Sequence, residues 1–253
     1  MKFTFLGTGT SQGVPVITCT CEVCTSSDKR NNRTRTSLMV QSATTCVVID
    51  TGPDFRQQML REKVKDLDAV VFTHEHKDHV AGLDDIRPFN YMLGKTIDVY
   101  AEERVQAALK NEFAYAFVGH DYPGAPQIRL QTISEMPFHI GDIPFVPIRV
   151  LHKKLPVFGF RIQDFTYITD ANFIDENEIE KIKGTKILVL NALRKETHYS
   201  HFNLEQAIDI VNLIQPEQAY FTHISHHLGL YETVQQELPS NISLAYDGLS
   251  IEI

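Results

Sequence analysis

Hydrophobic and polar positions follow two periods along this chain, and together they predict a mixture of strands and helices. Short runs rich in β-branched and aromatic residues predict strands at Lys2 to Leu6, Ser37 to Gln41 and Thr45 to Ile49. Five more apolar runs, each bounded by polar residues, predict buried strands: Asp68 to Thr73, Phe145 to Leu151, Phe165 to Thr169, Lys186 to Leu190 and Gln218 to Thr222. This order predicts an α/β protein with sheets covered by helices.

Helices are expected between these strands. Asp54 to Lys63 and Glu102 to Phe117 have helical composition, and Asn203 to Ile214 repeats apolar residues at helical spacing behind an N-capping Asn203. Tyr122 to Pro126 predicts a loop, and the prolines within Ile143 to Pro147 predict an edge strand or a bend. Neither break is long enough for an interdomain linker, so a single domain is expected.

Composition narrows the functional classes. The 253 residues are 43% hydrophobic, which suffices for a large core, and 24 Lys and Arg against 32 Asp and Glu give a formal charge of −8. An acidic chain lacks the basic field of a general DNA-binding protein. The N-terminal apolar run is broken by Gly7 and Gly9, and no apolar run reaches 18 residues. We therefore expect a cytoplasmic protein with neither a membrane nor a nucleic acid as partner.

A dense set of metal-ligating side chains follows the strand at residues 68 to 73. It reads His74-Glu75-His76-Lys77-Asp78-His79. Imidazole and carboxylate groups suit a borderline or hard divalent cation. Three later apolar runs each deliver one more such side chain at their end, namely His152, Asp170 and His223. In each case a buried strand ends in a potential metal ligand, and this shared pattern predicts a metal centre.

Three of the four cysteines are close together in the sequence. Cys19, Cys21 and Cys24 offer three thiolates, and a closed tetrahedral zinc site needs one ligand more. Cys46 lies in an apolar strand, where a free cysteine usually behaves as a small hydrophobic residue. Three cysteines within six residues are poorly placed to link distant segments by disulfide bonds, so we interpret them as metal ligands in preference to a disulfide.

The motif His74-x-His76-x-Asp78-His79, with single His, Asp and His residues later, resembles the signature of the metallo-β-lactamase superfamily over essentially the whole chain. Within it, the chain is similar to the phosphodiesterases of the carbon-phosphorus lyase pathway, which open 5-phosphoribosyl 1,2-cyclic phosphate, and to coenzyme PQQ synthesis B-like proteins. The resemblance implies a four-layer αββα sandwich, one domain over residues 1–253 with a zinc-binding loop at about 13–30, and a site at one edge of both sheets.

The resemblance also assigns ligands. It implies that His74, His76 and His152 hold one divalent ion, that Asp78, His79 and His223 hold a second, and that Asp170 bridges the two. It places Asp50 where a carboxylate orients a ligand histidine. It completes the cysteine site as a structural zinc with His226, and His227 is the competing residue. Zinc, manganese or iron fits the two-ion site.

The implied reaction is hydrolysis. Two ions about 3.5–4 Å apart share a hydroxide that attacks a phosphodiester, with Asp78 and His201 at the reaction centre. By the resemblance, His201 protonates the leaving group, and His198 is the alternative donor. Substrate anions are expected to meet Arg33, Arg35 or Arg87.

Other functions use the same ligands. A tRNA 3′-processing endonuclease would want a Gly- and Pro-rich arm and a basic surface, and the sequence offers neither. A lactone or thioester hydrolase and a non-catalytic carrier of the PQQ synthesis B type are further alternatives. The expected partner is a small-molecule phosphodiester, and similar proteins form homodimers.

Overall fold

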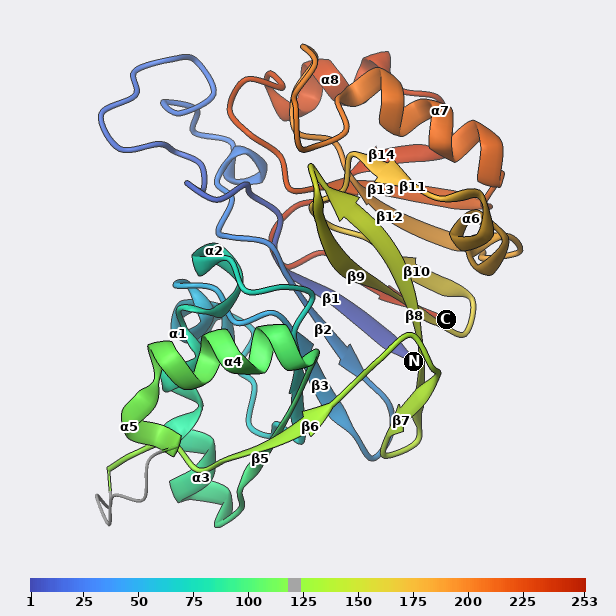
Figure 1. The fold of residues 1–253 in the computed structure, drawn as a ribbon. Coiled ribbons are helices and arrows are strands. Elements are labelled where there is room, and N and C mark those ends of the chain that lie inside the picture. Colours follow the sequence, from blue (N-terminus) through green and yellow to red (C-terminus); the bar gives the residue numbers. More distant parts are fainter. Residues whose placement is uncertain (118–123) are drawn as a thin grey trace.

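Two β-sheets face each other in a computed structural model, which describes residues 1–117 and 124–253 (Figure 1). The first sheet has the order β15-β1-β2-β3-β4-β5-β6. In chain order its strands are β1 (Lys2–Gly7), β2 (Ser37–Gln41), β3 (Cys46–Ile49), β4 (Ala69–Val71), β5 (Ile97–Ala101), β6 (Ile128–Thr132) and β15 (Ser250–Glu252). Strands β3 to β6 run parallel, so their carboxyl ends meet at one edge.

The second sheet has the order β11-β8-β9-β10-β12-β13-β14, and β7 pairs with β8 beside this path. Its strands are β7 (Phe138–Ile140), β8 (Ile143–His152), β9 (Leu155–Ile162), β10 (Phe165–Tyr167), β11 (Phe173–Ile174), β12 (Ile187–Asn191), β13 (Gln218–Thr222) and β14 (Ile242–Leu244). Strands β10, β12, β13 and β14 are parallel neighbours, so this sheet also gathers strand ends at one edge.

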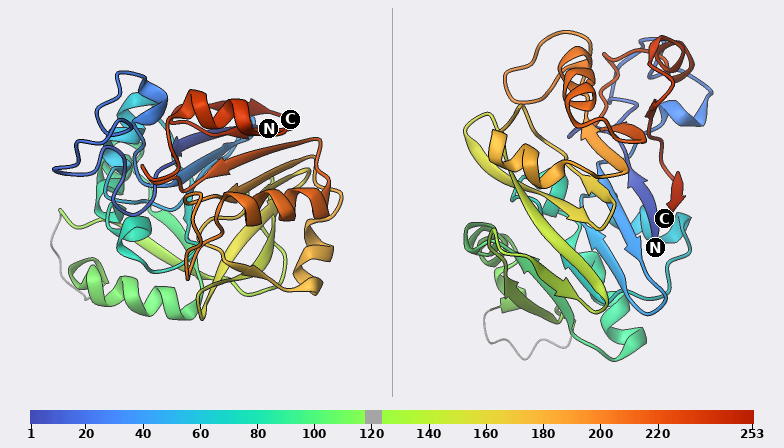
Figure 2. Two further views of the ribbon diagram at one scale, coloured as in Figure 1. Left: turned by 90° about the horizontal axis from the view of Figure 1, so that it is seen from above. Right: turned by 90° about the vertical axis from the view of Figure 1, so that its right-hand side faces the viewer.

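Helices cover the outer face of each sheet (Figure 2). The first sheet carries α1 (Phe55–Arg61), α2 (Lys77–Val80), α3 (Arg87–Leu93), α4 (Glu103–Glu112), α5 (Ala114–Phe117) and the 3₁₀ turn η2 (Leu83–Ile86). The second carries α6 (Glu176–Ile182), α7 (Leu204–Ile214) and α8 (Tyr231–Glu237), and the 3₁₀ turn η1 (Lys29–Asn31) lies in the N-terminal loop. The expected four-layer αββα arrangement is confirmed.

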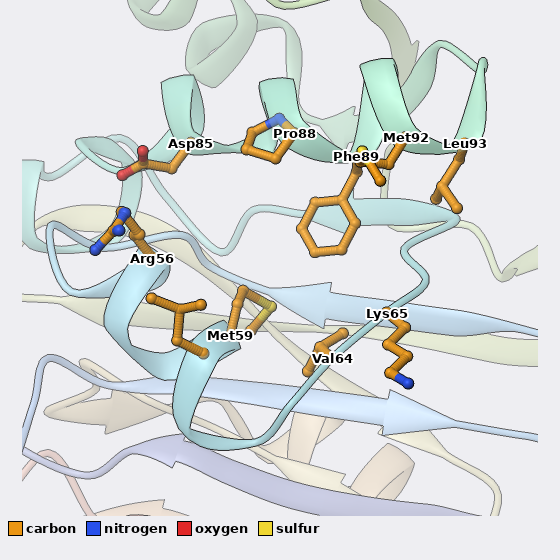
Figure 3. A pocket seen from close by; sticks show the side chains of 10 residues that line it. Arg56, Met59, Val64, Lys65, Asp85, Pro88, Phe89, Met92 and Leu93 are labelled. Carbon is orange, nitrogen blue, oxygen red and sulfur yellow. The ribbon is translucent and has the colours of Figure 1, made fainter.

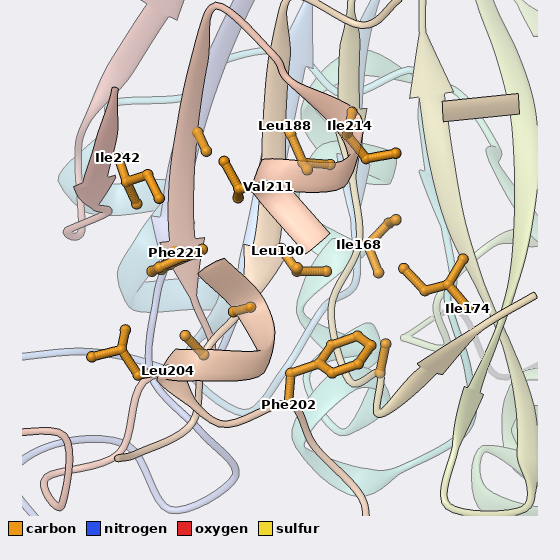
Figure 4. Close-up of a cluster of buried hydrophobic side chains, with 14 of the residues drawn as sticks. Ile168, Ile174, Leu188, Leu190, Phe202, Leu204, Val211, Ile214, Phe221 and Ile242 are labelled. Carbon is orange, nitrogen blue, oxygen red and sulfur yellow. The ribbon is translucent and has the colours of Figure 1, made fainter. Parts of the chain in front are cut away.

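Three hydrophobic clusters hold the four layers together. The central one lies between the sheets, where the rings of Phe3 and Phe165 stack with centroids 3.9 Å apart. A second joins the first sheet to α1, α3 and α4. In the third, Leu188, Leu190 and Phe221 of the second sheet face side chains of α7 (Figure 4). The inner strands thus have buried apolar residues on both faces, which is why they appear in the sequence as continuous apolar runs.

Most predicted elements appear within one or two residues of their expected bounds, including α7, where Asn203 is the N-cap and forms a capping box with Gln206. The single helix predicted over Glu102 to Phe117 is wrong. The backbone leaves helical geometry at Phe113 (φ −108°, ψ 40°), whose side chain is buried, and the segment divides into α4 and α5. The loop predicted at Tyr122 to Pro126 lies in part outside the described residues.

The prolines near residue 145 lie in β8, at positions with a free edge. Pro144 pairs with His139 of β7 and lies outside the part of β8 that pairs with β9. Pro147 pairs with Phe160 of β9 and lies outside the part of β8 that pairs with β7. A proline donates no hydrogen bond to a neighbouring strand, so each sits where only one neighbour is present. Among the described residues, no helix is long and apolar enough to cross a membrane.

Candidate metal centre

The predicted ligands converge where the strand ends of both sheets meet. His74, His76, Asp78 and His79 follow β4, His152 ends β8, Asp170 follows β10 and His223 follows β13. Ligand atoms of His74, His76 and His152 lie within 4.8 Å of one another, and so do those of His74, His79 and Asp170. The side chains of His74 and His223, which are 149 residues apart in the sequence, thus belong to the same cluster.

Asp170 is the centre of this arrangement. Its Oδ2 lies 3.0 Å from His79 Nε2 and 3.2 Å from His223 Nδ1, while Oδ1 lies 2.8 Å from His201 Nε2. Asp78 Oδ2 is 3.3 Å from the same His79 Nε2. One oxygen of Asp170 faces His79 and His223 and the other faces His201, so this carboxylate contacts side chains from three separate segments of the chain.

Three site residues have a left-handed backbone that non-glycine residues rarely adopt. Asp50, Asp170 and His223 have φ of 64°, 55° and 55°, and each directly follows a strand or the extended segment that continues it. Such a conformation costs on the order of 1–3 kcal/mol per residue and is concentrated at functional sites. Here it turns each side chain out of the strand direction and toward the shared point.

Asp50 fixes the orientation of His79. His79 Nδ1 donates to Asp50 Oδ2 at 2.7 Å, and Thr73 donates to the same carboxylate through its backbone NH and its hydroxyl. Gly52 allows the loop after β3 to approach α2, because a Cβ there would lie 2.2 Å from the carbonyl oxygen of Asp78. The placement matches the expected role of Asp50, since His79 is left with Nε2 facing the centre.

The unpaired ring nitrogens test whether a metal fits. His74 Nε2 is buried and makes no hydrogen bond within the described residues, although buried polar atoms are rarely left unpaired. The groups nearest to His79 Nε2 are the carboxylates of Asp78 and Asp170. Nδ1 of His152 donates to the carbonyl oxygen of Ser200 at 2.8 Å, which leaves Nε2 free to coordinate. Nitrogens held in this way on several sides of one carboxylate fit divalent cations.

The electrostatics agree with this interpretation. Burial lowers the pKa of His74 and His152, and it lowers the pKa of His223 to about 3, so these imidazoles are neutral, as ligands must be. Burial also disfavours the charged form of His79, but the carboxylates of Asp78, Asp170 and Asp50 outweigh it and raise its pKa well above the usual value. A cationic charge is therefore favoured among these carboxylates.

The three cysteines meet His226 and form a second cluster. His226 Nδ1 lies 3.3, 3.4 and 3.5 Å from Sγ of Cys19, Cys21 and Cys24. With Zn–S near 2.3 Å and Zn–N near 2.0 Å, a tetrahedral zinc separates sulfur from nitrogen by roughly 3.5 Å. The geometry therefore selects His226 over His227 as the fourth member. This cluster ties the loop at 13–30, which projects from the fold in Figure 1, to the segment after β13.

Replacing His226 by Ala should remove one tightly bound zinc per chain and leave the metals of the two-ion site in place. Structural zinc contributes folding free energy, so we expect a fall in Tm of roughly 2–4 °C for each kcal/mol lost, and faster proteolysis within residues 13–30. Elemental analysis and limited proteolysis measure both effects. His227→Ala is the matched control, and equal zinc loss in the two variants would contradict the assignment.

The expected arginine contacts need a correction. Arg33 is only 4% exposed, and its Nη1 donates to Thr8 Oγ1 and to the carbonyl oxygen of Ala245, so it joins segments inside the protein and is not offered to a substrate. Arg35 is paired with Asp54, and Arg87 with Asp84. Nearby carboxylates thus neutralise both, and their contact with a substrate stays a prediction.

The structure adds residues that the sequence did not single out. Thr10 Oγ1 lies 3.2 Å from His223 Nε2, and Thr73 is shared between Asp50 and His74. The only signal for Thr10 was its place after the sequence Gly7-Thr8-Gly9, and the signal for Thr73 was its position at the end of a strand. Hydroxyl groups have too many ordinary roles for such signals to be decisive.

A pocket on the outer face of the first sheet is separate from the metal centre. Apolar side chains of α1 and α3, among them Met59, Phe89 and Met92, line it (Figure 3). None of the predicted ligands takes part in this lining.

Comparisons with known proteins agree with the site. A family model described as a beta-lactamase superfamily domain matches residues 45–224. A Porphyromonas gingivalis protein named octanoyltransferase is 40% identical over 252 residues, which are 98% of this chain and 51% of that protein. A ribonuclease Z of Nostoc sp. is 25% identical over 168 residues, covering 65% of this chain and 47% of the relative. The chain thus spans about half the length of these curated relatives.

A solved structure is similar over nearly the full length of both chains. It is described as a new diphosphatase from the PhnP family, is 39% identical, covers 100% of this chain and 97% of its own, and superposes with a TM-score of 0.93.

Proposed function

Because the chain belongs to the metallo-β-lactamase superfamily, whose members are generally hydrolases, we propose that it is a metal-dependent phosphodiesterase. The observation that carries this proposal is the convergence of seven ligand-type side chains on one point, with the buried Nε2 atom of His74 left without a hydrogen-bond partner. His74, His76 and His152 would hold one ion, and Asp78, His79 and His223 the other, with Asp170 between them. When bound, two divalent ions activate water and neutralise charge on a phosphoryl group.

The residues of the chain have separate tasks in this reaction. Asp50 fixes the ring of His79 through Nδ1, and the carbonyl oxygen of Ser200 does the same for His152. We infer that His201, whose Nε2 lies 2.8 Å from Asp170 Oδ1, gives a proton to the leaving alkoxide. His198 contacts the other ring nitrogen of His201, and the two Nδ1 atoms are 3.1 Å apart. Because His201 lies between His198 and Asp170, we favour His201 as the proton donor.

Hydrolysis of a diphosphate bond is the second candidate. The solved relative at 39% identity is described as a diphosphatase, and the chemistry asks for the same charge neutralisation at phosphorus. Cleavage of tRNA precursors has less support, because the ribonuclease Z relative shares 25% identity over part of its length and this chain carries a net charge of −8. We do not extend octanoyl transfer to this chain, since that name describes a protein about twice as long.

Metal analysis followed by a phosphodiester assay tests the proposal. The purified protein should contain about three metals per chain and hydrolyse bis(p-nitrophenyl) phosphate when Mn²⁺ or Zn²⁺ is added. His76→Ala should lose this activity while the fold persists, because the side chain of His76 is exposed. Metal binding without phosphodiester or diphosphate hydrolysis would favour an ester, a lactone or a carrier role. The same preparation reports by gel filtration on the proposed homodimer.

A further inference from the structure

We propose that Tyr199 and Lys153 form a recognition platform beside the metal centre, which binds a phosphate ester carrying a planar aromatic group, such as a nucleoside. The inference rests on the proposed phosphoryl hydrolysis and names the part of the substrate that the metal ligands do not contact. Tyr199 would stack on the planar ring, and Lys153 would attract the phosphate.

The position of Tyr199 follows from its neighbours in the chain. Ser200, the next residue, accepts a hydrogen bond from the ligand His152 through its carbonyl oxygen, and His201 reaches Asp170. Tyr199 therefore lies where the segment before α7 passes the metal centre. Lys153 directly follows His152, in the turn between β8 and β9. Figure 1 shows that turn at the same end of the fold as the segment before α7.

The Lys153 ammonium group lies within cation–π range of the Tyr199 ring. Lys153 Nζ lies 5.1 Å from the centroid of the Tyr199 ring, and the ring of His198 lies on Tyr199 with centroids 4.5 Å apart. Even so, Tyr199 is 71% exposed, so most of its surface stays open. Within the described part of the chain, Lys153 takes part in no ion pair, in contrast to Arg35 and Arg87.

The backbone around the platform is held in place. The segment that carries Tyr199 is closed at its base, where the NH of Leu193 donates to the carbonyl oxygen of Phe202 at 3.0 Å. On the opposite side, Lys153 has φ of 61°, and its NH donates to Asn172 Oδ1 at 2.5 Å. A tyrosine side chain has only two rotatable χ angles, so it loses little entropy when a ligand stacks on it, which suits a recognition role.

Charge also favours a phosphate here. The chain is acidic as a whole, but Lys153 and Lys154 place two exposed cations directly after a metal ligand. An anionic substrate that approaches the centre therefore meets positive charge at this side. A sugar phosphate without a base would contact only the lysines, whereas a nucleotide would also stack on the Tyr199 ring. The difference in affinity between these two ligands therefore reports on Tyr199.

Calorimetric titration of the metal-loaded protein with AMP and with ribose 5-phosphate tests the inference. AMP should bind roughly 5- to 100-fold more tightly, the size of one base stacked on an aromatic side chain. Tyr199→Leu should remove that difference and Tyr199→Phe should keep it. Lys153→Ala should weaken both ligands about 2- to 5-fold, while Lys110→Ala, at an exposed position of α4, should change neither.

Equal affinity of the wild type for the two ligands, or an unchanged preference in Tyr199→Leu, would overturn the platform. The phosphodiesterase proposal is judged separately by wild-type hydrolysis of bis(p-nitrophenyl) phosphate. A preparation that hydrolyses this diester but does not prefer AMP over ribose 5-phosphate would keep the proposed function and reject the platform.

Discussion

Replacing Asp170 by Asn should lower kcat for bis(p-nitrophenyl) phosphate by about 10²- to 10³-fold, the order found when a charge-stabilising group is removed from an active site. The carboxylate faces His79, His201 and His223 at 2.8 to 3.2 Å. An amide has the same shape but no charge to bind two cations, and one of its positions becomes a hydrogen-bond donor. We also expect the bound metal to fall by at least one ion per chain.

The fold should survive this change, because asparagine tolerates the left-handed backbone that Asp170 adopts. Asp209→Asn, an exposed substitution on α7, is the matched control and should leave metal content and kcat unaltered. Elemental analysis, circular dichroism and steady-state rates measured together decide the matter. Full metal content with wild-type kcat in Asp170→Asn would refute the bridging role.

Replacing His201 by Ala should slow hydrolysis according to the leaving group. A proton donor typically contributes about 10²- to 10⁴-fold when the leaving group is an alkoxide, whereas p-nitrophenolate leaves well without protonation. We therefore expect a large fall in kcat for a cyclic ribose phosphate and a small one for bis(p-nitrophenyl) phosphate. Rates on both substrates, in the same metal-loaded preparations, give the measurement.

His198→Ala is the companion variant for this experiment. His198 is more exposed than His201 and contacts it through the two Nδ1 atoms, so its removal should cost less and affect both substrates alike. If His198→Ala gave the larger loss, selective for the alkoxide, the assignment of the two histidines would be reversed. Equal losses on both substrates in His201→Ala would point instead to a disturbed metal centre.

Local sequence pattern determined much of this protein. Apolar runs of five to seven residues indicated the buried strands, because strands covered on both faces have few polar positions. The helical spacing of Leu204, Ala207 and Val211 indicated α7, and Asn203 indicated where that helix begins. Ligand residues were visible for the same reason, since His152, Asp170 and His223 each interrupt an apolar segment with a polar side chain. These properties belong to neighbouring residues, so they can be read without knowing the fold.

The partner of each side chain was decided only by the tertiary structure. The sequence left both His226 and His227 as candidates for the cysteine cluster, and the position of the segment after β13 selects His226. Arg33 belongs to a basic run that suggested an anion site, yet the packing of the N-terminal loop against Ala245 buries it. Tyr199 belongs to no pattern in the sequence, and only the fold brings its ring to 5.1 Å from Lys153 Nζ. Periodicity is a property of adjacent residues, whereas such contacts depend on strand register and on the packing of layers from distant parts of the chain.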